Sequence, residues 1–205
     1  MASSSGRQPA TPLLPGALMP NYDLSSANLG RVANQDVDAL RIADQMVWSG
    51  SSIPTSGARI RPTWTPALQN SPGLYAHGWS FTSTDPVYIP AIWWYQPDHS
   101  DISDVIARLY LESDQSILTT ITLPQASVVR AAWNRIALPP PYLCSPGLGY
   151  RAAVVVSERQ SYENSGDFPH VGGPITVSAD YYNSGGGYPN TSWSGAHGLD
   201  IEWAV

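Results

Sequence analysis

From about Tyr75 to the last residue, the chain alternates hydrophobic and polar positions in short runs separated by loops rich in Gly, Pro and Asn. The clearest runs span residues 105–112, 117–123, 150–156 and 199–205. A period of two predicts β-strands, and many short strands with turn signals between them predict packed β-sheets. We therefore expect a mainly β protein whose residues 74–205 form a single antiparallel β-sandwich, of the jelly-roll or immunoglobulin-like type.

The alternation also predicts which face of each strand is buried. In the last strand, Leu199, Ile201, Trp203 and Val205 are expected to point inward, with Asp200 and Glu202 outward. In the run 105–112, the odd-numbered positions form the apolar face. The segment 84–86 (Thr-Asp-Pro) predicts a turn, and Pro90 predicts an edge or a bulge in its strand.

The first 73 residues follow a different pattern. Residues 1–33 are rich in Ser, Pro and Ala and are expected to form an extended N-terminal arm that contacts other chains, because they bury little apolar surface alone. Residues 34–46 predict one short helix, with Asn34 as its cap and apolar side chains at helical spacing. Residues 51–73 contain four prolines and predict an irregular connector, so the expected divisions are 1–33, 34–73 and 74–205.

Composition excludes several classes of function. The net charge is −6, and the ten basic residues are scattered, which argues against nucleic acid as a partner. The sequence contains no run of about 18 apolar residues, so it predicts no membrane span. The first twenty residues lack the features of a signal peptide, since prolines interrupt their apolar part. The single cysteine, Cys144, leaves no intrachain disulfide.

Several strand motifs resemble a known family. The segments that carry the resemblance are 78–83 (GWSFTS), 92–95 (IWWY), 107–110 (ARLY), 133–138 (WNRIAL), 150–156, 187–193 and 199–203. Together they resemble a β-sandwich domain of unknown function that occurs in actinobacterial cell-surface proteins and in structural, minor tail-type proteins of actinobacteriophages. The resemblance covers about residues 75–205 and implies no catalytic residues.

The resemblance implies a structural or interaction protein of a bacteriophage particle. Assembly in the host cytoplasm would require no signal peptide and no disulfides. We expect a peripheral tail or tail-tip protein, located in the virion, that binds other virion proteins through residues 1–73. A capsid decoration protein, a homo-oligomer and a carbohydrate-binding module that contacts cell-surface glycans remain alternatives at this point.

An aromatic loop and a second aromatic cluster are the candidates for glycan contact. Planar rings beside Asn and Asp suit the faces of pyranose sugars, although the same rings can simply close the end of a sandwich. The candidate residues are Trp93, Trp94, Tyr95, Tyr181, Tyr182, Tyr188 and Trp193.

The loop 97–104 carries weak candidates for a metal site. Asp98, Asp101 and Asp104 could offer oxygens to Ca²⁺, but their spacing lacks the Gly and the terminal Glu of an EF-hand loop. A solvated turn explains the same residues, so we expect no metal and no cofactor.

No motif predicts catalysis. Glu158, Glu163 and Asp167 lie in one acidic loop, but nothing in the sequence places two carboxylates across a sugar. The four histidines are dispersed, and neither H-E-x-x-H nor G-x-S-x-G occurs. We therefore expect a protein that is not an enzyme.

Overall fold

The computed structural model describes residues 52–69, 72–100 and 103–205, together with the backbone of four short strands between residues 31 and 48. The short N-terminal strands are β1 Arg31–Val32, β2 Gln35–Asp36, β3 Leu40–Ile42 and β4 Gln45–Trp48. Next come β5 Ala58–Arg59, β6 Leu68–Gln69, β7 Tyr75–Ser83, β8 Val87–Gln96, β9 Val105–Leu111 and β10 Ile117–Leu123. The chain continues with the 3₁₀ turn Gln125–Ser127, β11 Ala132–Cys144, β12 Tyr150–Val156, β13 Ser161–Glu163 and β14 His170–Gly172. The last strands are β15 Ile175–Ser184, β16 Thr191–Trp193, β17 Ala196–His197 and β18 Leu199–Ala204.

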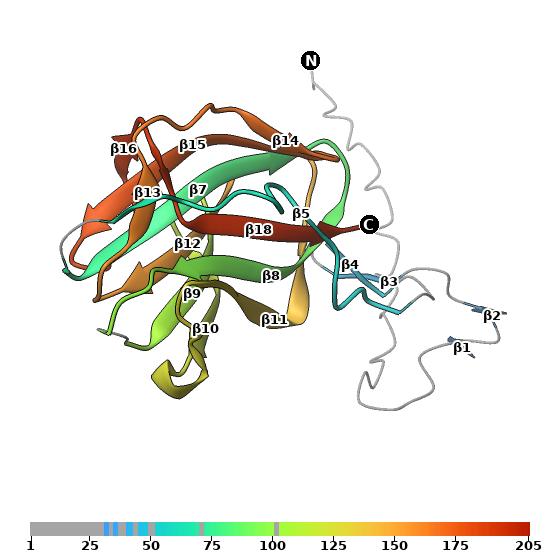
Figure 1. Ribbon diagram of the computed structural model, residues 1–205. Helices are drawn as coiled ribbons and strands as arrows, with labels where there is room; N and C mark the ends of the chain where they lie inside the picture. The colour runs from blue at the N-terminus through green and yellow to red at the C-terminus, as the bar shows by residue number, and fades with distance from the viewer. Residues whose placement is uncertain are drawn as a thin grey trace, which may run out of the picture. The chain divides into compact units, whose positions relative to one another are not determined.

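Two antiparallel sheets face each other, as the sequence predicts (Figure 1). A seven-stranded sheet has the order β10-β9-β12-β7-β15-β14, with β16 paired to β15. A four-stranded sheet has the order β11-β8-β18-β5. The chain crosses between the sheets from β7 to β8, from β8 to β9, from β10 to β11 and from β11 to β12. The mainly β fold predicted from the alternation is therefore confirmed.

The core fills the space between the two sheets. On β7, Trp79 and Phe81 are fully buried on the inner face, and small side chains alternate with them on the outer face. Ile92 of β8 and Ile201 of β18 meet them from the four-stranded sheet. At about 25 cal/mol per Å² of apolar surface, side chains of this size supply the main driving force for folding.

The central strand β12 is buried on both faces. Tyr150, Ala152, Val154 and Val156 join the core. On the opposite face, Val155 is covered by the glycine-rich loop after β15, where a Cβ on Gly186 would lie 3.0 Å from its Cγ1 atom. This cover explains why the strand reads as a nearly continuous apolar run.

The expected strand positions agree closely with the structure. β10 and β12 span the expected residues, and β9 and β18 each end one residue early. The turn at 84–86 joins β7 to β8. Pro90 lies in a central strand, and the register of both neighbouring strands shifts beside it, so the predicted bulge is confirmed.

The predicted helix over residues 34–46 is wrong at the positions that the structure describes. Residues 35–36, 40–42 and 45–48 are strands, and β3 pairs with β4 in an antiparallel hairpin. A helix of this length is marginal without a surface to pack on, whereas Ile42, Val47 and Trp48 all favour strands. The predicted arm, residues 1–33, lies outside the described residues except for β1, which pairs with β2.

The segment expected as an irregular connector contributes to two sheets. β5 pairs with β18 at the edge of the four-stranded sheet, and β6 pairs with β13. This pairing overturns the expectation that Asp200 and Glu202 face solvent, since both are almost completely buried. The sequence pattern identified their face correctly, but it could not show that residues 55–64 cover that face. At the end of the chain, Val205 is exposed rather than inward.

Cys144 is a free, fully buried thiol at the end of β11. Burial raises the pKa of this thiol far above its usual value, so it acts as a small apolar core residue. The described residues contain no helix with the length and hydropathy that crossing a bilayer requires.

Candidate functional site

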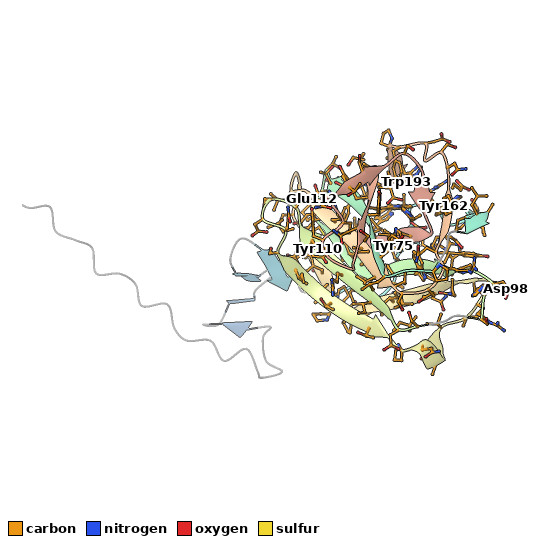
Figure 2. The ribbon with its side chains drawn as sticks, turned by 90° about the vertical axis from the view of Figure 1, so that its left-hand side faces the viewer. Tyr75, Asp98, Tyr110, Glu112, Tyr162 and Trp193 are labelled. Carbon is orange, nitrogen blue, oxygen red and sulfur yellow. The ribbon has the colours of Figure 1, made fainter. Side chains whose placement is uncertain are left out.

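A pocket of about 250 Å³ opens at the end of the sandwich where β13 and β16 lie (Figure 1). Figure 2 shows Tyr75, Tyr162 and Trp193 grouped at this end, with Asp98 and Glu112 apart from them. The lining of the pocket comes from five different strands and consists of Tyr75, His77, Tyr162, Tyr182, Trp193 and His197.

The seven-stranded sheet supplies one wall. Tyr75 and His77 continue the inner face of β7 beyond Trp79, so the apolar core gives way to polar aromatic side chains at this end. Tyr182 of β15 is the registered partner of His77. Trp193 of β16 is the registered partner of Asp180, which lies two positions before Tyr182 in β15.

The opposite wall comes from a small three-stranded sheet, β17-β13-β6. Tyr162 of β13 is the registered partner of His197 of β17. The sheet is tied to the four-stranded sheet by backbone hydrogen bonds at Gly198, whose carbonyl accepts from the Tyr95 amide and whose amide donates to the Ser161 carbonyl, each at 2.8 Å. The two walls are therefore held by separate parts of the backbone.

Two imidazoles meet at the floor of the pocket. The ring centroids of His77 and His197 lie 3.8 Å apart, and His77 stacks on Trp94 with its ring plane 10° away from parallel. Burial, together with the neighbouring His197, holds the pKa of His77 well below its usual value, against a smaller opposing effect of the Gln160 side chain. His77 is therefore neutral at physiological pH.

His197 is oriented by a buried carboxylate. The Oδ2 atom of Asp180 accepts a hydrogen bond of 2.6 Å from the His197 backbone amide and lies 3.0 Å from the ring atom Nδ1. A proton on Nδ1 satisfies this carboxylate, which leaves Nε2 as an acceptor whenever the ring is neutral. Asp180 thereby fixes the tautomer and the position of one side of the pocket floor.

Some buried polar atoms around the pocket have no hydrogen-bond partner among the described residues. They are Nε1 of Trp193 and Oδ1 of Asp180. Each such atom costs about 1–3 kcal/mol when it is left unsatisfied. Those beside the pocket are within reach of a polar group that enters it, which is one way such atoms are satisfied at functional sites.

The structure separates the aromatic residues that the sequence grouped together. Tyr182 and Trp193 line the pocket. Tyr181 and Tyr188 lie on the other face of the seven-stranded sheet, where the Arg151 guanidinium stands 3.7 Å from the centroid of the first ring and 4.7 Å from that of the second. These two tyrosines help to hold the glycine-rich loop against β12.

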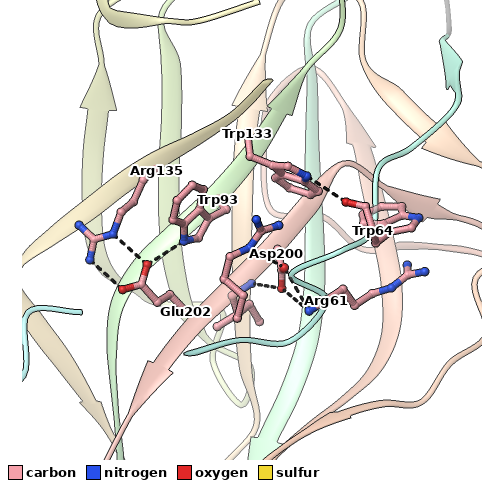
Figure 3. Close-up of polar contacts among 9 residues, drawn as sticks. Arg61, Trp64, Trp93, Trp133, Arg135, Asp200 and Glu202 are labelled. Atoms are coloured by element: carbon pink, nitrogen blue, oxygen red, sulfur yellow. Dashed lines mark hydrogen bonds and ion pairs between the residues drawn. The ribbon is translucent and has the colours of Figure 1, made fainter. Parts of the chain in front are cut away.

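The remaining aromatic candidates belong to the four-stranded sheet. Trp94 is fully buried in the core, so it has no surface with which to stack on a glycan. Trp93 points to the outer face, where its Nε1 atom donates a 2.7 Å hydrogen bond to Glu202 (Figure 3). Tyr95 packs edge-to-face against Trp133.

The weak metal candidates do not form a described site. Asp98 is exposed, and Oδ1 of Asp104 accepts a 2.8 Å hydrogen bond from the Gln125 amide. Asp101 lies outside the described residues. Within the described ranges, no three His, Cys, Asp or Glu side chains come together as metal ligands.

Two carboxylates in and beside the acidic loop after β12, those of Glu158 and Glu163, contact side chains elsewhere in the domain. Glu158 is buried and accepts a hydrogen bond from the Ser103 hydroxyl, and burial raises its pKa. Glu163 lies 3.9 Å from the Arg61 guanidinium. Neither residue lines the pocket.

Sequence reasoning missed four of the six lining residues: Tyr75, His77, Tyr162 and His197. Only long-range pairing brings them together, because they lie in three separate strands up to 122 positions apart (75 to 197). One available signal was the change along β7 from Trp and Phe to His and Tyr at alternating positions.

Neither a scan against protein-family models nor a search of the curated proteins finds a match to this chain. The case for function therefore depends on the residues and on the geometry of the pocket.

Proposed function

We propose that the protein is a non-enzymatic structural and interaction component of a bacteriophage particle, attached through its N-terminal third. A peripheral tail or tail-tip position, with the β-sandwich directed outward, is the preferred arrangement. The strand motifs at residues 75–205 resemble those of phage structural proteins, and an antiparallel sandwich is the fold that this resemblance implies.

The observation that supports the proposal is that the sandwich buries its own apolar surfaces. Its interior is filled by side chains of the described domain, and residues 55–64 and the loop after β15 cover parts of its outer faces. These surfaces need no partner to become buried. Attachment can therefore fall to the residues before the sandwich, of which residues 1–33 are rich in Ser, Pro and Ala.

A truncation tests the proposal. Removal of residues 1–50 is expected to leave a folded β-domain that no longer enters particles. Particles would be produced in cells that supply either the full or the shortened chain, purified on a density gradient and analysed by immunoblot. Circular dichroism of the shortened chain must show β-structure that unfolds cooperatively, so that lost incorporation reflects lost attachment.

Two controls sharpen the result. Removal of residues 1–38 alone retains the paired strands β3 and β4, so it locates the attachment within the N-terminal third. Immunogold labelling of particles that carry the full chain distinguishes a tail from a capsid position. Wild-type incorporation of the chain lacking residues 1–50 would rule out attachment through those residues and overturn the proposal.

A further inference from the structure

We infer that the pocket at the end of the sandwich binds a single neutral sugar ring, such as the terminal residue of a glycan. This inference does not depend on how the chain is attached to a particle. It replaces the expected flat aromatic platform with a pocket of different composition, in which Tyr182 and Trp193 join Tyr75, His77, Tyr162 and His197.

The size of the pocket limits the ligand. Pockets that enclose drug-sized molecules usually measure about 300–1,000 Å³. This pocket, at about 250 Å³, holds one substituted six-membered ring but not an oligosaccharide. A longer glycan would therefore enter by its end, with the remaining residues outside.

The walls have the chemistry that a pyranose ring requires. Trp193 stands nearly perpendicular to Tyr162, at 78°, and to Tyr182, at 89°, so aromatic rings bound the space from more than one direction. Ring faces suit the C–H groups of a sugar, while tyrosine hydroxyls and imidazole nitrogens can bond to its hydroxyls. A purely apolar ligand would leave these polar groups without partners.

The charge of the pocket favours a neutral ligand over an anion. Its lining, as far as the structure describes it, includes no Arg, Asp or Glu. His77 is held neutral by burial, and the carboxylate nearest to the floor, Asp180, faces His197. An acidic sugar or a phosphate would find no guanidinium to pair with in this lining.

The unpartnered polar atoms are a second, independent indication of a ligand. His77 is 1% exposed and lines the pocket with the Gln160 side chain as its hydrogen-bond partner, whereas Nε1 of Trp193 in the same lining has none. A fold without a ligand here would be more stable with an apolar side chain at this position of β7, as at Trp79 and Phe81. A polar ring ligand, with the water that accompanies it, would satisfy such groups after a small movement of the side chains.

Saturation-transfer NMR on the full chain tests the inference. The probes are the methyl glycosides of glucose, galactose, mannose, rhamnose and arabinose, each at about 10 mM, so that millimolar affinities are detected. Choline serves as the cationic probe, because aromatic cages also bind quaternary ammonium groups, and sialic acid serves as the anionic one. At least one neutral glycoside is expected to bind more tightly than choline or sialic acid.

Matched variants locate the binding. Trp193→Ala removes one aromatic wall and is expected to weaken binding by roughly tenfold or more. Tyr162→Phe removes only a hydroxyl, preserves the packing and should weaken binding measurably. Tyr188→Phe makes the same chemical change on the opposite face of the sheet, next to Arg151, and should leave binding unchanged. The indole N–H signal of Trp193 should shift when the glycoside is added.

Three results would overturn the inference. The first is that no neutral glycoside binds the wild-type chain. The second is that Trp193→Ala and Tyr162→Phe, both shown by circular dichroism to be folded, bind as tightly as wild type. The third is that choline or sialic acid binds more tightly than every neutral glycoside, which would assign the pocket to a charged ligand.

Discussion

Arg135 holds the carboxylate of Glu202 with two hydrogen bonds, 2.8 Å from Nε to Oε2 and 2.9 Å from Nη2 to Oε1 (Figure 3). Trp93 Nε1 and the Gly57 amide donate to the same carboxylate at 2.7 and 2.8 Å. Glu202 of β18 thereby links β11, β8 and the segment before β5. One buried side chain joins three parts of the chain that are distant in sequence.

The first prediction concerns Glu202→Gln. Burial alone would raise the pKa of Glu202, but the hydrogen bonds from Arg135, Trp93 and Gly57 outweigh it and hold the pKa below its ordinary value of 4.5. This stabilisation is complete above the unfolded pKa and is lost as the pH falls through the folded pKa. Urea titrations at pH 7 should show about 1–2 kcal/mol less stability in the variant. Its deficit should shrink toward pH 3.

Glu163→Gln is the matched control for this prediction. Glu163 lies 3.9 Å from Arg61, and both side chains are partly exposed, so the loss should stay below about 0.5 kcal/mol. Equal losses of stability in the two variants would mean that the buried hydrogen bonds of Glu202 stabilise the fold no more than the exposed ion pair of Glu163 does.

The second prediction concerns Asp200→Asn and has the opposite pH dependence. Burial raises the pKa of Asp200 above its ordinary value of 3.8, against the opposing effect of Arg59. Ionisation of Asp200 therefore costs stability at neutral pH, and this cost disappears as the pH falls below the folded pKa. The variant leaves Arg59 without its charged partner, so it should be destabilised at pH 7. Its deficit should grow on acidification. A deficit that shrinks toward low pH would contradict the assigned direction.

The third prediction concerns the attachment of the segment before β5 to the sheet. A Cβ on Gly57 would lie 2.0 Å from the backbone oxygen of Trp203, so Gly57→Ala forces two backbones apart. We expect a loss of about 1–3 kcal/mol and faster hydrogen exchange at the Ile60 amide, which donates to Ile201. Gly187→Ala is the control, because its Cβ would meet nothing closer than 3.4 Å. Unchanged exchange at Ile60 in the Gly57 variant would refute the clash.

The fourth prediction concerns the floor of the pocket. Asp180→Asn removes the carboxylate that faces Nδ1 of His197, so the ring should change its tautomer balance, and unfolding should become easier by about 1–3 kcal/mol. Imidazole ¹⁵N shifts measure the tautomer. Asp85→Asn, at an exposed turn, should change neither quantity appreciably. An unaltered His197 spectrum would show that Asp180 does not set the tautomer.

Local patterns were sufficient to predict most of the sandwich. β9, β10 and β18 carry their alternation in their own residues, and β12 is recognised by its nearly continuous apolar run. The turn at 84–86 needs only Pro86 and its neighbours. The inward positions of Leu199 and Ile201 followed from the same period of two.

The errors arose where distant segments decide the outcome. Asp200 and Glu202 look like a solvent-facing pair until residues 55–64 cover them. The helix predicted at 34–46 relied on spacing alone, and strand pairing between β3 and β4 replaced it. The six lining residues of the pocket could not be predicted as one site from the sequence. They come together only because β15 pairs with β7 and β13 pairs with β17.

Opposite Pro90, the register shift of the four-stranded sheet falls on three consecutive prolines of β11. Strand β11 forms one edge of that sheet, and Pro139, Pro140 and Pro141 follow one another within it. Proline has no backbone N–H, so this stretch offers no donor to an incoming strand. A second copy of the chain therefore cannot extend the sheet along residues 139–141 in an amyloid-like fashion.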